Sequence, residues 1–305
     1  MSARPAASPL SLRDFLIALA IVAVWGTNFV VAKIALDMIP PLFLATLRFT
    51  FVLFPALFLI KRPAVPWKDL AAYGLLIGAG QFALLYTAMK GHISPGLASL
   101  VIQVQVAFTI ALSVITNGEQ VRPFQWIAGF LAAAGILLIG LRGSGSATPF
   151  GLALVVLAAS CWAGGNMVSK RSPRANMLAY VVWASLFAVP PLLIVSLTFD
   201  GFDAIRDGVT RADASVWAAV LWQSVGNTMF GYGLWGWLLA RHPAASVAPM
   251  SLLVPVFGMG ASALLLGEAM PAWKLWAAGL VMGGLALNLL WLRLSARLVR
   301  RTAPG

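Results

Sequence analysis

Residues 24–33 of the chain read VWGTNFVVAK, and residues 161–170 read CWAGGNMVSK. Three residues of the first stretch recur at matching offsets in the second: Trp25 as Trp162, Val31 as Val168 and Lys33 as Lys170. Each stretch also carries an asparagine, Asn28 or Asn166, inside an otherwise apolar run. The recurrence predicts an internal repeat, and the asparagines mark polar positions within it.

A second alignment extends the repeat, because residues 93–119 align with 242–268 without a gap. The matched pairs are Phe108 with Phe257, Ser113 with Ser262, Gly118 with Gly267, and Glu119 with Glu268, followed by Trp126 with Trp276 and Gly129 with Gly279. The offsets of both alignments are close to half the chain length. We therefore interpret the chain as two related copies.

The composition is that of a membrane protein. The chain has 305 residues, of which 61% are hydrophobic and only 10% are charged, against about 25% charged residues in soluble domains. Roughly 20 apolar residues are needed to cross a bilayer as a helix. This criterion predicts ten spans: 14–33, 41–60, 70–89, 95–116, 124–141, 149–169, 177–198, 216–239, 244–266 and 273–293.

The predicted fold is an all-α integral membrane protein with ten transmembrane helices in two inverted five-helix repeats. The first repeat covers 1–142, the second covers 149–293, and a basic cytoplasmic tail follows over 294–305. Because five is odd, the second copy enters the membrane from the opposite side. Inverted repeats are a common plan of secondary transporters, which bind substrate near the midplane between the repeats. Duplication without transport is the alternative.

The distribution of basic residues predicts the orientation. Lys and Arg number 21; with Arg48 inside a span, fourteen fall on the side of both termini and six on the other. The positive-inside rule then places both termini in the cytoplasm, and the inner membrane of a bacterium is the expected location. The net charge of +12 does not indicate nucleic acid, because the basic residues flank apolar runs and form no continuous face.

Several stretches resemble one family. They are WGTNFVVAK (25–33), the arginine in LATLRF (44–49), GLASLVIQVQVAFTI (96–110), NGE (117–119), MSLLVPVFG (250–258) and LGE (266–268). Together they are similar to the EamA group of the drug/metabolite transporter superfamily, and more narrowly to bacterial exporters of O-acetylserine and cysteine. The resemblance covers nearly the whole chain. It implies ten helices, an inner-membrane location and export of small amino-acid-like metabolites.

One charge lies well inside a predicted span. Arg48 is about 12 Å from the start of the second span at 1.5 Å per residue, and arginine within a membrane span indicates function by default. We hypothesise that Arg48 receives a substrate carboxylate, because the guanidinium group pairs with carboxylates through two parallel hydrogen bonds. The alternatives are snorkelling to the membrane surface or a structural ion pair with Asp37 or Glu268.

Amides and aromatic residues complete the candidate binding site. Asn28 lies one turn after Trp25, and the pairs Trp162–Asn166 and Gln223–Asn227 are also one turn apart. The remaining candidates are Gln81, Gln103, Gln105 and Tyr86. Gln103 and Gln105 differ by about 200° of helix rotation, so only one of them is expected to face the cavity. Each amide could instead hold helices together.

Other aromatic residues and the prolines have separate interpretations. Aromatics near span ends are interpreted as anchors at the membrane surface: Trp183, Trp222, Tyr232, Trp235 and Trp237. Pro249 and Pro255 remove backbone donors within the ninth span, and Pro95 with Gly96 begins the fourth, its repeat mate. These four residues are candidates for gating elements; simple packing kinks are the alternative.

No motif indicates a cofactor, a metal or catalysis. GYGLWG at 231–236 matches a dinucleotide-binding pattern but follows no strand. His92 and His242 fall on opposite membrane faces in this topology, so they cannot share a metal. A broad drug effluxer is the alternative transporter, although no mid-span Asp or Glu attracts a cation. A receptor or membrane enzyme is the alternative from another class. The coupling ion stays open, and nothing requires an oligomer.

Overall fold

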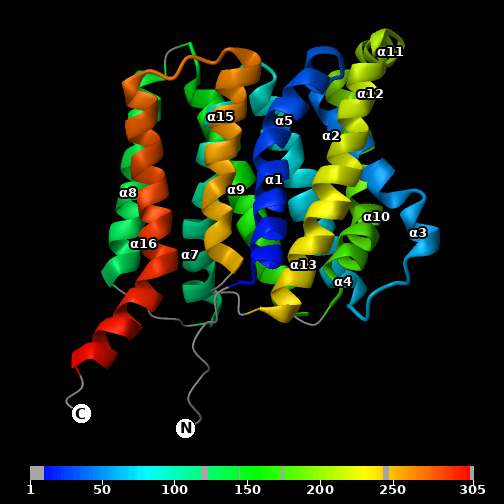
Figure 1. Ribbon diagram of the computed structural model, residues 1–305. Coiled ribbons are helices and arrows are strands. Elements are labelled where there is room, and N and C mark those ends of the chain that lie inside the picture. The colour runs from blue at the N-terminus through cyan, green and yellow to red at the C-terminus, as the bar shows by residue number, and fades with distance from the viewer. Residues whose placement is uncertain (1–9, 118–122, 144, 173–174, 243–246, 303–305) are drawn as a thin grey trace.

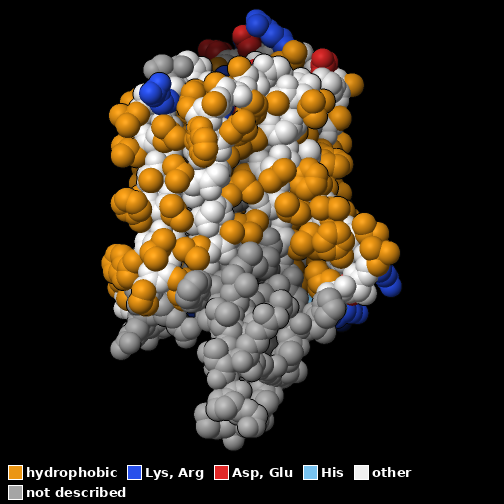
Figure 2. Space-filling model, turned by 60° about the vertical axis from the view of Figure 1, so that its left-hand side comes forward, with side chains coloured by type: hydrophobic (Ala, Val, Ile, Leu, Met, Phe, Trp, Pro, Cys, Tyr) orange, Lys and Arg blue, Asp and Glu red, His pale blue; other side chains and the backbone are white. Residues whose placement is uncertain are grey.

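The computed structural model describes residues 10–117, 123–143, 145–172, 175–242 and 247–302. Regular structure in these ranges is helical, apart from one isolated bridge between Ile93 and Ala147. The helices run side by side along one axis as a bundle (Figure 1). Hydrophobic side chains cover the face seen in Figure 2 over most of its height, and charged side chains gather at its ends. The surface is that of a protein embedded in a bilayer.

The first half of the chain forms α1 (Leu12–Met38), α2 (Pro41–Leu53), α3 (Ala56–Leu59), α4 (Trp67–Tyr73), η1 (Gly74–Gln81), α5 (Phe82–Met89), α6 (Pro95–Val101), η2 (Ile102–Val104), α7 (Gln105–Asn117) and α8 (Pro123–Arg142). The second half forms α9 (Pro149–Ser169), α10 (Met177–Val195), η3 (Ser196–Asp200), α11 (Phe202–Arg211), α12 (Ala214–Leu221), η4 (Trp222–Phe230), α13 (Gly231–Arg241), η5 (Ala248–Leu253), α15 (Val254–Leu266) and α16 (Ala272–Thr302). Of the interruptions, η1, η3 and η4 are π-helical, whereas η2 and η5 are 3-10 turns.

Local sequence signals place the helix ends. The Ser11 hydroxyl accepts the Asp14 N–H at 3.1 Å at the start of α1, and the Thr148 hydroxyl accepts the Gly151 N–H at 3.0 Å at the start of α9. Side-chain oxygens at these positions satisfy backbone donors that have no partner within the helix. α15 ends at Gly267, whose φ of 65° is left-handed and favours glycine.

Helical segments cover nine of the ten predicted spans wherever those residues are described, and the span 41–60 is broken by a turn at Phe54 and Pro55 between α2 and α3. Within the described residues, seven helices are long and apolar enough to cross a membrane: Leu12–Met38, Pro41–Leu59, Trp67–Met89, Pro95–Thr116, Pro123–Arg142, Pro149–Ser169 and Met177–Asp200. Shorter apolar helices follow over Met250–Leu266 and Ala272–Leu287. Ten crossings therefore stay a prediction.

Two segments between or after the predicted spans are helical, and two residues of the predicted repeat lie outside the described ranges. The segment after the seventh span contains the short helix α11, and the predicted tail continues α16 as far as Thr302. Gly118 and Glu119, the repeat mates of Gly267 and Glu268, lie outside the described residues, as do Arg4, Arg122 and Arg174.

Contacts between the two halves are reciprocal. In the first half, α1 packs against α15 and against α12, η4 and α13; in the second half, α9 packs against α7 and against α5 and η1. The remaining long helices pair in the same way, α2 with α10 and α8 with α16. A contact between two helices thus recurs between their repeat mates: α1 packs on α15, and their mates α9 and α7 pack on each other.

The irregular turns also recur between the halves. The offset that aligns 93–119 with 242–268 carries the π-helical η1 onto residues 223–230, within η4. It carries the 3-10 turn η2 onto residues 251–253, within η5. Mid-helix π and 3-10 segments are uncommon and often lie at functional sites. Their recurrence at matched positions indicates that they belong to the architecture.

The two halves start at opposite ends of the bundle. α1 begins at the end where α16 finishes, whereas α9 begins at the other end (Figure 1). The Ile93–Ala147 bridge lies just before α9 and joins the loop after α5 to the loop after α8.

Close packing of α1 on α15 yields a stability prediction. A Cβ atom at Gly26 would lie 2.5 Å from Phe257 Cβ and 2.6 Å from the Val254 carbonyl oxygen. Gly26→Ala should therefore lower the free energy of unfolding by about 1–3 kcal/mol, the usual cost of overpacking. The measurement is the thermal unfolding midpoint of the purified protein in detergent.

Gly260→Ala is the matched control, because nothing lies within 4 Å of a Cβ added there. It should leave the midpoint unchanged or raise it, since alanine favours helix over glycine. Equal midpoints for the two variants would contradict the packing described here.

Candidate functional site

A cavity of about 350 Å³ lies between the two halves. Helical segments of both halves contribute to its wall: α1, α4, η1, α5, η2, α7, α9, α10, η4, α13, η5 and α15. Most of the predicted binding residues line it: Trp25, Asn28, Gln81, Tyr86, Gln103, Gln105, Trp162, Asn166 and Asn227. The fold therefore brings together residues from both repeats, and only Arg48 and Gln223 of the predicted set lie elsewhere.

The two ends of the cavity differ in exposure. Leu239 is 39% exposed and Met177 is partly exposed, and both lie at the end of the bundle where α1 begins. Toward the opposite end the wall is formed by Ala32, Tyr86 and Met89, each only 1% exposed. The cavity wall is thus more exposed at the end where α1 begins, and the other end, where these buried residues lie, is called the closed end below.

A buried ion pair lies at that end of the bundle. Glu268 accepts hydrogen bonds from Lys274 Nζ at 2.8 Å, the Ser94 hydroxyl at 2.5 Å and the Gly96 N–H at 3.1 Å, and it also accepts the Ser262 hydroxyl. The Lys274 and Glu268 side chains are 1% and 9% exposed. The network connects the last residues of the α15 segment to the start of α6, which belongs to the other half.

Electrostatics at this closed end favour the charged form of Glu268. Burial raises the pKa of its carboxyl, but hydrogen bonds from Lys274, Ser262 and Ser94 outweigh burial and leave the pKa below its ordinary value. Nearby, Lys90 donates to the Leu36 carbonyl at the end of α1. Burial lowers the pKa of the Lys90 ammonium, and Asp37 acts in the opposite direction.

The predicted gating residues occupy irregular positions. Pro95 begins α6, and a Cβ at Gly96 would lie 2.8 Å from Glu268 Oε2, so glycine lets the carboxylate approach the backbone. Pro255 is buried in the first turn of α15. Pro249 lies in η5, and its side chain is outside the described set. These positions fit a helix that changes type, and gating stays a prediction.

Arg48 is buried, and its two terminal nitrogens donate to neutral groups, whereas its Nε has no hydrogen-bond partner among the described residues. Its Nη1 donates to the Tyr86 hydroxyl at 2.9 Å, and Nη2 donates to Asn227 Oδ1 at 2.6 Å and to the Thr228 hydroxyl at 2.8 Å. The guanidinium carbon lies 4.0 Å from the centroid of the Phe82 ring, within the range of a cation–π interaction. The contacts join α2 and α5 of one half to η4 of the other.

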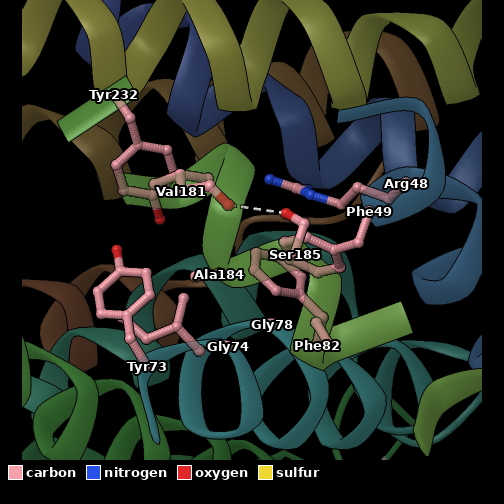
Figure 3. A pocket seen from close by; sticks show the side chains of 12 residues that line it. Arg48, Phe49, Tyr73, Gly74, Gly78, Phe82, Val181, Ala184, Ser185 and Tyr232 are labelled. Atoms are coloured by element: carbon pink, nitrogen blue, oxygen red, sulfur yellow. Dashed lines mark hydrogen bonds between the residues drawn. The ribbon is translucent and has the colours of Figure 1, made fainter. Parts of the chain in front are cut away.

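The structure separates Arg48 from the large cavity. Arg48 borders a small interior space of about 10 Å³ (Figure 3), which shares Tyr73, Phe82 and Tyr232 with the cavity wall. In this view its side chain extends toward the interior, while Tyr73 and Tyr232 turn their hydroxyl groups toward one another. Tyr86 and Asn227 therefore stand between the guanidinium and the cavity.

Neither structural alternative for Arg48 holds. Asp37 pairs with Lys33 and Glu268 pairs with Lys274, so both expected ion-pair partners are engaged elsewhere. Snorkelling is also wrong, because Arg48 is 1% exposed. The guanidinium is a buried positive charge whose hydrogen-bond partners are all uncharged.

Gln223 extends this network through Tyr86. It is completely buried, and its Oε1 accepts the Tyr86 hydroxyl. Gln223, Asn227 and Thr228 all belong to the π-helical η4. Sequence analysis missed Thr228 and Phe82 as partners of Arg48; the one available signal was that Thr228 directly follows a candidate amide.

Two amides that line the cavity have unpartnered oxygens. Asn28 Oδ1 and Gln81 Oε1 are buried and have no hydrogen-bond partner among the described residues. Leaving a buried polar atom without a partner costs roughly 1–3 kcal/mol. By contrast, Asn166 Nδ2 donates to Gln105 Oε1 at 3.1 Å, so this pair links α9 to α7. Asn28 and Gln81 are thus the cavity-lining amides whose oxygens have no partner among the described residues.

Two predictions about the cavity wall are wrong. Gln103 and Gln105 both line the cavity, although a regular helix would turn them apart. The 3-10 turn η2 interrupts the helix between them, and Gln103 sits at an edge where it also borders a second hollow. Tyr232 and Trp235 are cavity residues rather than surface anchors, because both line the cavity and contact Trp25 with tilted rings, whose centroids are 5.7 and 5.1 Å away.

Comparison with known proteins identifies the family. The model of the EamA-like transporter family matches residues 13–141 and again residues 149–290. The chain belongs to the EamA-like transporter family. A probable amino-acid metabolite efflux pump of Salmonella typhimurium is 42% identical over 301 residues, which covers 96% of this chain and 99% of that protein. A protein of the same description from Escherichia coli is 40% identical over 291 residues, with 93% and 97% covered.

A solved crystal structure shares the fold. It superposes with a TM-score of 0.64 at 20% identity and covers 96% of this chain and 99% of its own. As an EamA-like transporter the protein is a multi-pass membrane protein. Among its described residues, no group of three His, Cys, Asp or Glu side chains is placed to hold a metal ion.

The Arg48 network in this EamA-like transporter yields a second stability prediction. Tyr86→Phe removes the hydroxyl that links Arg48 Nη1 to Gln223 Oε1 and leaves both atoms unpartnered. The free energy of unfolding should fall by about 1–3 kcal/mol. The measurement is again the thermal midpoint in detergent.

Tyr73→Phe is the control. Tyr73 lines the same cavity, and its hydroxyl makes no hydrogen bond to another described residue. A Tyr86→Phe midpoint no lower than that of Tyr73→Phe would rule out a structural role for the linked hydroxyl.

Proposed function

We propose that this protein is a secondary exporter of small amino-acid metabolites, of the O-acetylserine and cysteine type, which works by alternating access in the inner membrane. The observation that carries the proposal is the central cavity: it lies between the halves, holds polar groups deep in the bundle, and has a wall that is more exposed at one end than at the other. The relatives described as probable amino-acid metabolite efflux pumps support the substrate class.

The transport mechanism rests on ten membrane spans in two inverted repeats, over 1–142 and 149–293. Support comes from the two family matches, the reciprocal helix contacts and the irregular turns at matched positions. The opposite starting ends of α1 and α9 support the inversion. Two such halves can exchange conformations, so that inward-open and outward-open states have similar energies.

Orientation follows from the charge distribution. The excess of Lys and Arg on the side of the termini places that side in the cytoplasm, together with the basic tail 294–305. The exposed end of the cavity then faces the cytoplasm, from which an exporter loads its substrate. Because the whole cavity lies within one chain, transport needs no oligomer.

A zwitterionic substrate fits the charges of the cavity. Arg48 holds Asn227 Oδ1, which leaves the Asn227 amide N–H groups as donors for a carboxylate, with the positive charge of Arg48 directly behind. The oxygens of Asn28 and Gln81, which are buried and unpartnered in this structure, turn toward the α-ammonium when substrate binds and accept its N–H groups. Arg48 thus acts through Asn227 and Tyr86, and the initial hypothesis of direct carboxylate contact is replaced by this indirect one.

The remaining predicted residues shape the cavity. Trp25 donates its indole N–H to the Asn227 carbonyl at 3.1 Å and stacks with Tyr232 and Trp235. Trp162, Gln103 and the Gln105–Asn166 pair form the facing wall. This aromatic cluster is the feature that favours the second candidate function, a broad drug and metabolite effluxer, because flat aromatic faces bind many hydrophobic molecules.

Gating uses the closed end. Opening to the outside requires Glu268 to leave the start of α6, so we assign the closing contact to the Glu268–Lys274 pair and Gly96. Pro95 begins the fourth span, whose helix type changes at η2, and Pro249 and Pro255 flank the change from η5 to α15 in the ninth; these changes are the points where the two spans are expected to bend.

Transport in liposomes tests the function and the ammonium site together. Cysteine and O-acetylserine should move, threonine and an aromatic amino acid more slowly, and a cationic dye not at all. Gln81→Met should raise the half-saturating cysteine concentration about tenfold or more, because a hydrogen bond to a charged group contributes roughly 1.5–3 kcal/mol.

3-Mercaptopropionate, which lacks the amino group, is the matched substrate for this comparison. Its half-saturating concentration should be high, and Gln81→Met should leave it unchanged. An equal loss for both substrates would remove Gln81 from the ammonium site, and no transport of any compound would overturn the exporter assignment.

Glu268→Gln tests the closed end. With Cys161 replaced by serine, a cysteine at Ala32, which is 1% exposed at the closed side of the cavity, reports access to a membrane-impermeant thiol reagent added outside. Glu268→Gln should raise the labelling rate about tenfold, since a charge-assisted contact is worth roughly 1.5–3 kcal/mol.

Acid should act in the same direction as the substitution. Because the pKa of Glu268 in the closed state is below its ordinary value of 4.5, the ion pair persists at neutral pH and is lost as the pH falls through that lowered pKa. The control is Asp203→Asn, which changes an exposed acid of α11. Labelling that stays constant in Glu268→Gln would show that another contact closes the cavity.

A further inference from the structure

A second hollow, of about 180 Å³, lies on the outer side of the bundle among α7, α8 and α16. Its wall is apolar, as at Val106, Ile110 and Leu285, with two exceptions. Gln125 lies near the start of α8, and Gln103 lies deep in the bundle at η2. The hollow is therefore an elongated apolar space with one amide at each end.

The surroundings of the hollow are those of a bilayer-facing surface. On α8, which is long and apolar enough to cross a membrane, Trp126 is 70% exposed and Phe130 is 73% exposed. Figure 2 shows hydrophobic side chains over this side of the molecule. In a membrane these side chains contact acyl chains, so the medium next to the hollow is hydrocarbon and not water. An empty hollow would forfeit the dispersion contacts of its lining.

Tight packing beside the hollow explains why protein does not fill it. A Cβ at Gly284 would lie 2.5 Å from the Ala128 carbonyl, so α16 and α8 already touch there. At Gly129, which lines the hollow, nothing lies within 4 Å of an added Cβ. Helices α8 and α16 thus meet each other closely and leave an open space against α7.

The hollow adjoins the central cavity. Gln103 lines both, so one side chain and the short turn η2 form the partition between them. Whatever occupies the hollow lies against the outer side of that partition and completes the cavity wall.

We propose that one acyl chain of a membrane phospholipid occupies this hollow and seals the central cavity from the bilayer at Gln103. The chain enters past Gln125, so its headgroup lies in the leaflet at the end of the bundle where α8 begins. The inference rests on the membrane placement within the proposed function and is independent of the transported substrate.

Gly129→Phe tests the proposal by filling the hollow. Its matched control is Gly279→Phe, the repeat mate on α16, where a Cβ also meets nothing within 4 Å but which does not line the hollow. Each delipidated protein is mixed with phosphatidylethanolamine, and bound lipid is counted by native mass spectrometry. The wild type and Gly279→Phe should hold one more phospholipid than Gly129→Phe.

Equal lipid counts for Gly129→Phe and Gly279→Phe would overturn the proposal. If Gly129→Phe does not fold, Ala107→Phe fills the same hollow from α7 and is judged by the same count. If the wild type transported nothing but still held one more phospholipid than Gly129→Phe, the result would count against the exporter assignment alone, because the lipid count needs no substrate.

Discussion

The buried guanidinium of Arg48 is the constraint on which the centre of the molecule depends. A charge inside a bilayer must find partners within the protein, because no water is available there. Tyr86, Asn227 and Thr228 supply them, and two of the three come from the opposite half of the chain. The same contact therefore solvates the charge, holds the two halves together and orients the amide of Asn227 toward the cavity.

Irregular helices make this arrangement possible. Gln223, Asn227 and Thr228 all lie within the π-helical η4, and Gln81 is the last residue of the matching segment η1. A wider turn redirects the side chains that follow it, so more polar groups converge on one place than a regular helix allows. The 3-10 turn η2 has a comparable effect on Gln103 and Gln105, both of which line the cavity.

The molecule combines pseudo-symmetry with a functional asymmetry. Matched segments of the halves pack reciprocally, yet the cavity wall is more exposed at one end, and at the other the Glu268–Lys274 pair contacts the start of α6. Glu268 is charged in this position because Lys274 and two hydroxyl groups donate to it. Polar contacts that are well satisfied in one state and broken in the other are suited to a switch between states of similar energy.

The sequence by itself determined the membrane class, the helical segments, the internal repeat and most of the polar residues of the cavity, because hydropathy and recurrence are local properties of the chain. It could not determine that Arg48 stands behind Tyr86 and Asn227, that Gln223 lies outside the cavity, or that Tyr232 and Trp235 face Trp25. Those facts depend on helix rotation across π and 3-10 turns and on contacts between residues far apart in the chain, most of them more than a hundred positions. Only the tertiary structure decides them.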